Sequence, residues 1–269
     1  MNPEYPVFVP TKGRYNTPYT IRALEALDIP YTAVIEKQEY TEYKTVVQKG
    51  EIIVLPHQDK GLTVTRNWIW DYTQRELKTP YFWTFDDNIR DFYRLNNNIK
   101  YRVTSGTFLK IMEDFIQRYI NVYIAGMNYE MFVPRKRKRT PITLNTRIYS
   151  NMLIKADIPY RNVTFYNDDT DLCLRVLKDG YCTILFNAFL ADKIATMQVR
   201  GGMTDYYNKT DKRREFAEEL QRAHPTSLRL SGAITAGIMM LIIRALSITS
   251  SSRDLMQLSL MSQMNMEWC

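Results

Sequence analysis

The stretch that most constrains the fold is the apolar run of residues 81–85, which ends abruptly in Asp86, Asp87 and Asn88. A run of this length, bounded by Pro80 on one side and by acids on the other, is typical of a buried central strand. Its carboxyl end is then the edge of an open α/β sheet at which ligands bind. Because two adjacent carboxylates repel each other, we expect a cation to offset Asp86 and Asp87. Mn²⁺ or Mg²⁺ fits, since one or two carboxylates and substrate phosphates usually hold such an ion; the simpler interpretation is a turn or a helix cap.

The segments around this run alternate between β-prone stretches and amphipathic helices. Before it, the sequence predicts strands at residues 6–10, 31–35 and 51–55, and helices around Leu24, at 40–48 and at 62–76. After it, we expect a turn at 96–98, helices at 108–119, from Asp168 and at 211–223, and strands at 122–127, 147–154 and 181–186. This order predicts an α/β fold with a mostly parallel, Rossmann-type central sheet that helices flank on both faces.

Arg66 and Asn67 lie near the start of the helix expected at residues 62–76. The apolar stripe of that helix is expected to be Val64, Trp68, Ile69 and Tyr72. Arg66 is either an ordinary surface charge or, together with Asn67, part of a clamp that binds a donor molecule close to the Asp pair.

A second acidic cluster opens a later helix. Asp168, Asp169 and Asp171 stand directly before its apolar positions. One interpretation is a helix N-cap with acids favoured by the helix dipole, which explains one or two carboxylates well and three poorly. The other is a catalytic carboxylate that takes the proton of an acceptor hydroxyl.

Five consecutive cations stand between Pro134 and Pro141: Arg135, Lys136, Arg137, Lys138 and Arg139. Such a run is most often a solvated loop. It follows an expected strand inside the domain, however, and each cation that neutralises a phosphate adds affinity for nucleic acid. The formal net charge of +7 and the isoelectric point near 9.2 also favour an anionic partner. A contact with the DNA backbone is therefore the functional interpretation.

The three cysteines, Cys173, Cys182 and Cys269, show neither metal-ligand spacing nor an even disulfide framework. Cys173 and Cys182 are expected to be reduced core thiols. The first residues hold no apolar segment of the kind found in signal peptides, so we expect a cytoplasmic protein without a membrane partner.

The motifs that carry a family resemblance are residues 10–14, 55–56, Gly61, 66–68, 86–88, 168–172 and 201–202. Together they resemble the TET/JBP-associated glycosyltransferase family, which is found in phages and has the GT-A fold of nucleotide-sugar glycosyltransferases. The paired acids alone are weakly specific. Their place after a fourth strand, combined with the Lys-Gly-Arg loop and the second acidic helix start, makes the resemblance moderately specific.

The resemblance implies a role for each motif. The loop after the first strand would cradle the nucleotide: Thr11, Lys12, Gly13 and Arg14. Asp86 would touch the ribose, and Asp87 would bind the metal that holds the diphosphate. Asp168 and Asp169 would stand beside the acceptor, with Asp171 as an alternative partner. The metal would stabilise the leaving nucleoside diphosphate, and a carboxylate would deprotonate the attacking hydroxyl.

The implied donor is a UDP-sugar and the implied acceptor is a hydroxymethylated pyrimidine in double-stranded DNA, as in phage DNA modification in the host cytoplasm. Two other functions stay open. The same donor site would serve a glycosyltransferase for protein or polysaccharide, and the same fold would serve a non-catalytic nucleic-acid-binding domain.

The sequence departs from the family pattern near its end. GT-A enzymes often place a late histidine on the metal, and the last histidine here is His224. We assign the glycosyltransferase domain to residues 1–230, with a donor half at about 1–100 and an acceptor half at about 101–230. Residues 231–269 form an atypical apolar and Met/Ser-rich tail, which reflects either a frameshift in the gene that removes a metal ligand or an amphipathic closing helix before a disordered end.

Overall fold

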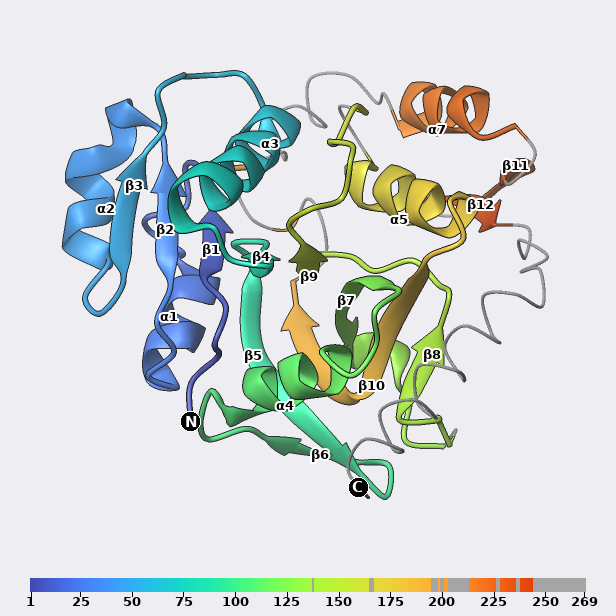
Figure 1. The fold of residues 1–269 in the computed structure, drawn as a ribbon, viewed down its shortest axis with the longest axis horizontal. Coiled ribbons are helices and arrows are strands. Elements are labelled where there is room, and N and C mark those ends of the chain that lie inside the picture. The colour runs from blue at the N-terminus through green and yellow to red at the C-terminus, as the bar shows by residue number, and fades with distance from the viewer. Residues whose placement is uncertain are drawn as a thin grey trace, which may run out of the picture.

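The computed structural model describes residues 1–136, 138–164, 167–194, 198, 201–202, 213–225, 228–235 and 238–243. Its centre is a ten-stranded sheet with the strand order β3-β2-β1-β4-β9-β7-β10-β5-β6, and β8 also pairs with β10 (Figure 1). The strands are β1 (Val7–Pro10), β2 (Thr32–Ile35), β3 (Glu51–Val54), β4 (Tyr81–Phe85), β5 (Ile89–Asn96), β6 (Ile99–Arg102), β7 (Val122–Tyr129), β8 (Ile142–Leu144), β9 (Asn151–Lys155) and β10 (Cys182–Lys193).

Most strands of the sheet run in the same direction. β3, β2, β1 and β4 pair in parallel, as do β7 and β10, and β9 runs antiparallel between β4 and β7. β5, β6 and β8 are antiparallel additions to the β10 side. The expected α/β architecture, with most strands running in one direction and with helices beside the sheet, is confirmed.

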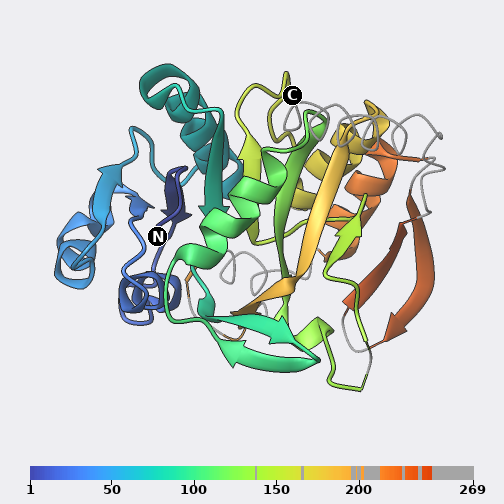
Figure 2. The ribbon, with the colours of Figure 1, turned by 60° about the horizontal axis from the view of Figure 1, so that its bottom comes forward.

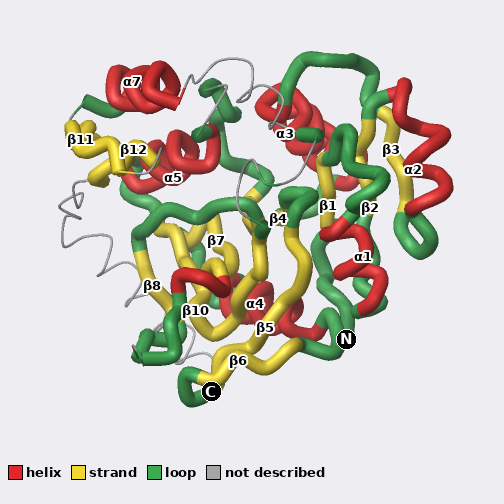
Figure 3. The backbone as a smooth tube through the Cα atoms, turned by 180° about the vertical axis from the view of Figure 1, so that it is seen from behind, coloured by secondary structure: helices red, strands yellow, loops and turns green. Residues whose placement is uncertain are grey.

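Helices cover both faces of the sheet (Figures 1 and 3). They are α1 (Tyr19–Ala26), α2 (Tyr40–Val46), α3 (Leu62–Tyr72, extended by a π-turn at Thr73–Leu77), α4 (Thr107–Ile116), α5 (Asp168–Lys178) and α7 (Arg213–Ala223), with 3₁₀ turns at η1 (Lys37–Glu39) and η3 (Glu130–Phe132). Within the described part of the chain, no helix combines the length and apolar character needed to cross a membrane.

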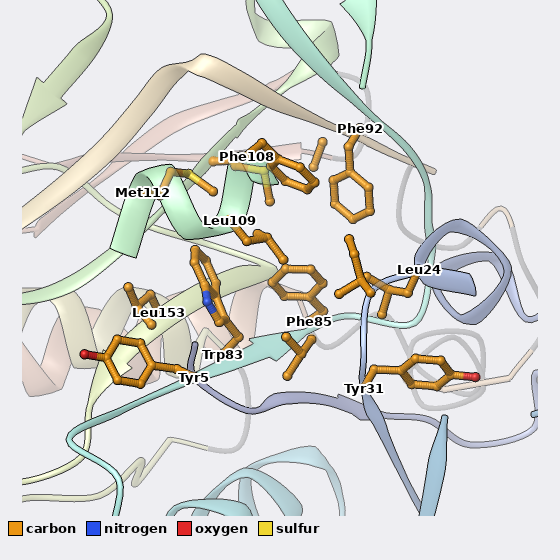
Figure 4. Close-up of a cluster of buried hydrophobic side chains, with 14 of the residues drawn as sticks. Tyr5, Leu24, Tyr31, Trp83, Phe85, Phe92, Phe108, Leu109, Met112 and Leu153 are labelled. Atoms are coloured by element: carbon orange, nitrogen blue, oxygen red, sulfur yellow. The ribbon is translucent and has the colours of Figure 1, made fainter. Parts of the chain in front are cut away.

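Alternating side chains of β4 separate two hydrophobic clusters. Trp83 and Phe85 point to the face covered by α1 and α4, where they pack with Leu24 and Phe108 (Figure 4). Phe82 points to the opposite face, which α3 and α5 cover. Since both faces of β4 are covered, its five residues are all buried, which agrees with a run that is apolar except for Thr84.

The orientation of α3 differs from the expected one. Ile69 is buried as expected, but Val64 is 42% exposed, and the helix buries Trp70 and the charged Arg66 against the sheet. Trp68 and Tyr72 stack on each other and are only partly buried. Arg66 is therefore no surface charge, and its burial requires partners that neutralise it.

The apolar segment near the end of the chain forms strands rather than a closing helix. β11 (Leu228–Thr235) and β12 (Ile238–Ile243) pair antiparallel in a separate two-stranded sheet. Figure 2 shows this hairpin beside α7. The expected disordered end, residues 244–269, lies outside the described residues.

Candidate active site

The acid pair lies where the parallel strands β1 and β4 end side by side. Thr11 follows β1 directly, and Asp86 and Asp87 follow β4. The Oγ1 of Thr11 donates to Oδ2 of Asp87 over 3.0 Å, and the guanidinium of Arg14 pairs with Oδ1 of the same carboxylate. The first-strand loop and the acid pair therefore form one site, as the sequence predicts.

Asp86 is held by cations on both of its oxygens. Arg66 from α3 lies 2.7 Å from Oδ1, while Lys193 from the end of β10 and the hydroxyl of Ser150 each lie 2.7 Å from Oδ2. Burial opposes ionisation of Asp86, but Lys193 and Arg66 outweigh it and hold the pKa of this carboxyl well below its usual range.

The neighbouring carboxyl is shifted in the opposite direction. Burial, together with the negative charge of Asp86, raises the pKa of Asp87 above its ordinary value despite the ion pair with Arg14. Asp87 therefore lacks sufficient positive charge around it, and an additional cation would favour its ionised form.

Arg66 connects the acid pair to the second acidic cluster. Its Nη1 lies 2.6 Å from Oδ2 of Asp168, while its Nη2 contacts Asp86. The Nε atoms of Arg66 and Arg14 are buried and have no hydrogen-bond partner among the described residues. Buried guanidinium N–H groups without an acceptor suit an anionic ligand such as a phosphate.

The environments of Asp168 and Asp169 differ. Burial, with the charge of Asp169, raises the pKa of Asp168 although Arg66 opposes the shift. Burial acts on Asp169 in the same sense, but Arg147, 2.8 Å from its Oδ2, outweighs it and lowers the pKa of Asp169. Of the two, Asp168 is the carboxylate with the stronger tendency to take a proton.

Asp171 is not part of this arrangement. Its carboxylate is buried between Arg175, at 2.6 Å, and Nε2 of His224, at 2.8 Å. The Nδ1 of His224 lies 2.7 Å from Nζ of Lys178, and an ammonium only donates, so Nδ1 accepts there and Nε2 donates to Asp171. Asp171 thus joins α5 to the end of α7, and His224 is bound to it rather than to the acid pair.

Two other residues that were predicted to bind the donor molecule, Lys12 and Asn67, are paired with protein groups outside the acid pair. Lys12 lies 2.8 Å from Glu36 at the end of β2 and also pairs with Asp59. The side-chain amide of Asn67 binds the backbone of Asn162 at both ends, over 2.8 Å and 2.9 Å. Asn67 therefore fixes the loop before α5.

Gly13 lies against the last family motif. It has a φ of +66°, and a Cβ on Gly201 would come within 2.5 Å of the carbonyl oxygen of Gly13. The N–H of Gly202 donates to the carbonyl of Lys12 over 2.8 Å, and Arg14 donates to the carbonyl of Gly201. Only glycine permits this close approach of two backbones.

Three contributors to the site were not predicted from the sequence: Lys193, Ser150 and Arg147. Lys193 lies at the end of a strand that was expected to stop at residue 186 and continues through a register shift between Phe186 and Leu190. Ser150 has a φ of +61° just before β9. Nothing in the local sequence distinguishes these residues, because their proximity to Asp86 and Asp169 arises only from the sheet order.

The basic run lies on the loop between η3 and β8. Arg135, Lys136, Lys138 and Arg139 are exposed, and Arg137 lies outside the described residues. The ion pairs found among the described residues include none of these four cations. These four residues form the exposed cationic segment.

The described side chains of the site could hold a divalent ion only together with a bound ligand that supplies further oxygen atoms. Among the described residues, no group of three or more His, Cys, Asp or Glu side chains is arranged to hold a metal. Asp87, whose pKa is raised, and Asp86 could supply one or two carboxylates, and phosphates and water would supply the other positions. This is the usual way in which Mg²⁺ is bound at phosphate sites.

Comparison with known proteins identifies the family of the chain. The model of the family described as TET-Associated Glycosyltransferase matches residues 5–202. No curated protein matches the chain. Among solved structures, S. aureus TarS 1-349 is 13% identical with a TM-score of 0.43, over 82% of this chain and 66% of that chain. The inositol-1-phosphate CTP transferase from T. maritima is 8% identical with a TM-score of 0.38, over 80% of this chain and 96% of that chain.

Proposed function

Because the chain belongs to the TET-Associated Glycosyltransferase family and is a glycosyltransferase, we propose that it moves a sugar from a UDP-sugar to a hydroxymethylated pyrimidine in DNA. The reaction would serve the hypermodification of phage DNA in the host cytoplasm. The observation that carries the proposal is the bridge made by Arg66, which joins Asp86 on the donor side to Asp168 on the acceptor side.

Charge balance supports a donor that binds together with a metal. The four carboxylates of the site, Asp86, Asp87, Asp168 and Asp169, are matched by Arg14, Arg66, Arg147 and Lys193. A diphosphate added alone would leave this buried site with excess negative charge. A divalent ion that arrives with the diphosphate restores neutrality, and Asp87 is the carboxylate best placed to hold it.

The residues of the chain then have distinct roles. Thr11, Lys12, Gly13 and Arg14 hold the nucleotide, and the unpartnered Nε atoms of Arg14 and Arg66 are donors for its phosphates. When bound, Mn²⁺ or Mg²⁺ stabilises the charge that develops on the leaving diphosphate. Asp168 accepts the proton of the attacking hydroxymethyl group, since its raised pKa favours proton uptake.

The exposed cations Arg135, Lys136, Lys138 and Arg139 support DNA as the acceptor. Contacts between such cations and phosphates release counterions and bind DNA without regard to sequence. A base-modifying enzyme with many acceptor sites along a genome needs binding of this kind.

The proposal is tested by incubating the protein with Mn²⁺, a panel of nucleotide sugars and hydroxymethylated DNA. Nucleoside mass spectrometry should reveal a pyrimidine heavier by one sugar, with a UDP-sugar as donor, and no such product from unmodified DNA. Product on a protein or polysaccharide acceptor and none on DNA would show that the acceptor is wrongly assigned.

A further inference from the structure

Three aromatic rings gather on the acceptor half: Tyr129 at the end of β7, Phe132 in η3 and Tyr149 before β9. The ring of Tyr129 lies 4.3 Å from that of Tyr149 and 5.4 Å from that of Phe132, centroid to centroid, and the other two rings are 6.2 Å apart. Phe132 is 48% exposed. Single exposed apolar residues are common, so exposure alone does not indicate a function. A role for these three rings, here called the aromatic cluster, must be argued from their position.

The aromatic cluster lies between the donor side and the acceptor side of the site. The hydroxyl of Tyr129 contacts Ser150 and lies 3.2 Å from Nζ of Lys193, and both of these groups hold Asp86. The ring of Tyr149 faces the guanidinium of Arg147 at 5.4 Å, and Arg147 holds Asp169.

The aromatic cluster is also fixed to the exposed cationic segment. Arg139 donates to the carbonyl of Phe132 over 3.1 Å. On the other side, the hydroxyl of Tyr149 donates to Asn128, which binds Asn187 over 2.8 Å. Asn187 in turn donates to the carbonyl of Thr140, directly after the cations. These hydrogen bonds hold the exposed cationic segment and the aromatic cluster in a fixed position relative to each other.

We propose that Tyr129, Phe132 and Tyr149 form the surface on which the acceptor pyrimidine stacks after it leaves the DNA helix; this rests on the proposed function. A group attached to a stacked, paired base cannot enter a buried site, and enzymes that act on bases extrude them. Aromatic side chains stack on any base, while neighbouring cations bind the backbone. The exposed Phe132 is the first ring that an entering base meets, and the hydroxymethyl group then faces the Asp86–Asp168 region.

Phe132→Ala tests this inference, with Phe132→Tyr as the conservative variant and Ile111→Ala, a 49% exposed residue on α4, as the matched control. The first readout is kcat/KM for transfer to hydroxymethylated duplex DNA. We expect Phe132→Ala to lower it by about 10-fold or more, because the variant cannot form a base–aromatic stack at this position. Phe132→Tyr and Ile111→Ala should stay close to the parent, and binding of UDP with Mn²⁺ should be unchanged in all three variants.

The second readout needs no turnover. A 2-aminopurine placed next to the hydroxymethylated base brightens when its neighbour is extruded, so the parent protein and Phe132→Tyr should raise its fluorescence and Phe132→Ala should not. Equal transfer and equal fluorescence for Phe132→Ala and the parent would overturn the stacking surface and leave the proposed function intact.

The two proposals fail separately. If no donor supports transfer to DNA, the proposed function fails, and the fluorescence alone tests the stacking surface. A rise in fluorescence that depends on Phe132 supports extrusion of the base. No rise in fluorescence overturns the stacking surface. If Phe132→Ala instead lowers transfer to an oligosaccharide while DNA is not bound, the rings stack on a sugar and the inference is wrong.

Discussion

Asp86 and Asp87 are adjacent in sequence, yet their pKa values shift in opposite directions. Lys193 and Arg66 hold the Asp86 carboxyl in its charged form against the effect of burial. Among the described residues, Asp87 forms an ion pair with Arg14 alone, and burial with the charge of Asp86 raises its pKa. A carboxyl must lose its proton before it can bind a metal. Metal binding by Asp87 should therefore weaken as the pH falls through its raised pKa.

Asp87→Asn should therefore weaken Mn²⁺-dependent binding of UDP. We expect a decrease of at least about 10-fold, since even removal of a group that hydrogen-bonds a metal ligand typically costs 10–100-fold in affinity. Isothermal titration calorimetry with and without Mn²⁺ measures it. Asp157→Asn, at an exposed carboxylate that pairs with Lys155, is the matched control. Unchanged Mn²⁺-dependent affinity in Asp87→Asn would exclude Asp87 as a metal ligand.

Asp168 and Asp169 predict a pH profile. A base works only when it has lost its proton, so kcat/KM should fall as the pH drops through the raised pKa of Asp168. Asp168→Asn should remove this acid limb and lower kcat by about 10²–10⁴-fold. Asp169→Asn removes a charge that raises the pKa of Asp168, so the limb should move to lower pH. A limb that persists in Asp168→Asn would assign the base elsewhere.

At the scale of elements, the loop between η3 and β8 carries the charge that should bind DNA. Replacing Arg135, Lys136, Arg137, Lys138 and Arg139 with Gln should weaken DNA binding at low salt. The slope of log K against log salt should also become shallower, by about 0.9 for each DNA phosphate that the variant no longer neutralises. Fluorescence anisotropy at several salt concentrations measures both quantities.

The control variant has the same net charge as the loop variant, because it loses five cations at other positions. Five exposed cations of the donor half, Arg22, Lys37, Lys44, Arg75 and Lys78, are replaced with Gln. This variant should bind DNA with nearly the parent's slope. If both variants bind DNA equally weakly, only the net charge matters and the loop makes no specific contact.

The elements themselves were predictable to different degrees. Strands in the parallel part are covered by helices on both faces, so their residues form continuous apolar runs. These runs predicted β1, β2, β4 and β7 from the sequence. The β5–β6 hairpin was not, although the turn at Asn97 and Asn98, with φ of 49° and 62°, was expected. β6 pairs only with β5, and its exposed face carries the apolar Ile99 and Tyr101 while Lys100 is partly buried, so it lacks the apolar-in, polar-out alternation that marks a strand.

At the scale of the whole molecule, the sheet brings together residues that are far apart in the chain. Arg66 binds Asp86 and Asp168, which lies 102 positions later, and Lys193 reaches Asp86 over 107 positions. The segments that we expect to form a donor half and an acceptor half are thus joined by ion pairs, of which Arg66–Asp168 is buried. Removing one partner of such a pair leaves an uncompensated buried charge. Substitutions in one half should therefore affect the other.

The sequence by itself determined the α/β order, the site edge at the end of β4, the acidic start of α5 and the family, because apolar periodicity and short motifs are local properties. The tertiary structure alone decided which charges meet. It placed Asn67 on Asn162 and Asp171 on His224, away from the acid pair, and it brought Lys193, Ser150 and Arg147 to the site. It also shifted the pKa values of Asp86 and Asp87 in opposite directions. A pKa depends on burial and on charges within a few ångströms, and those neighbours come from strands and helices that chain order does not put side by side.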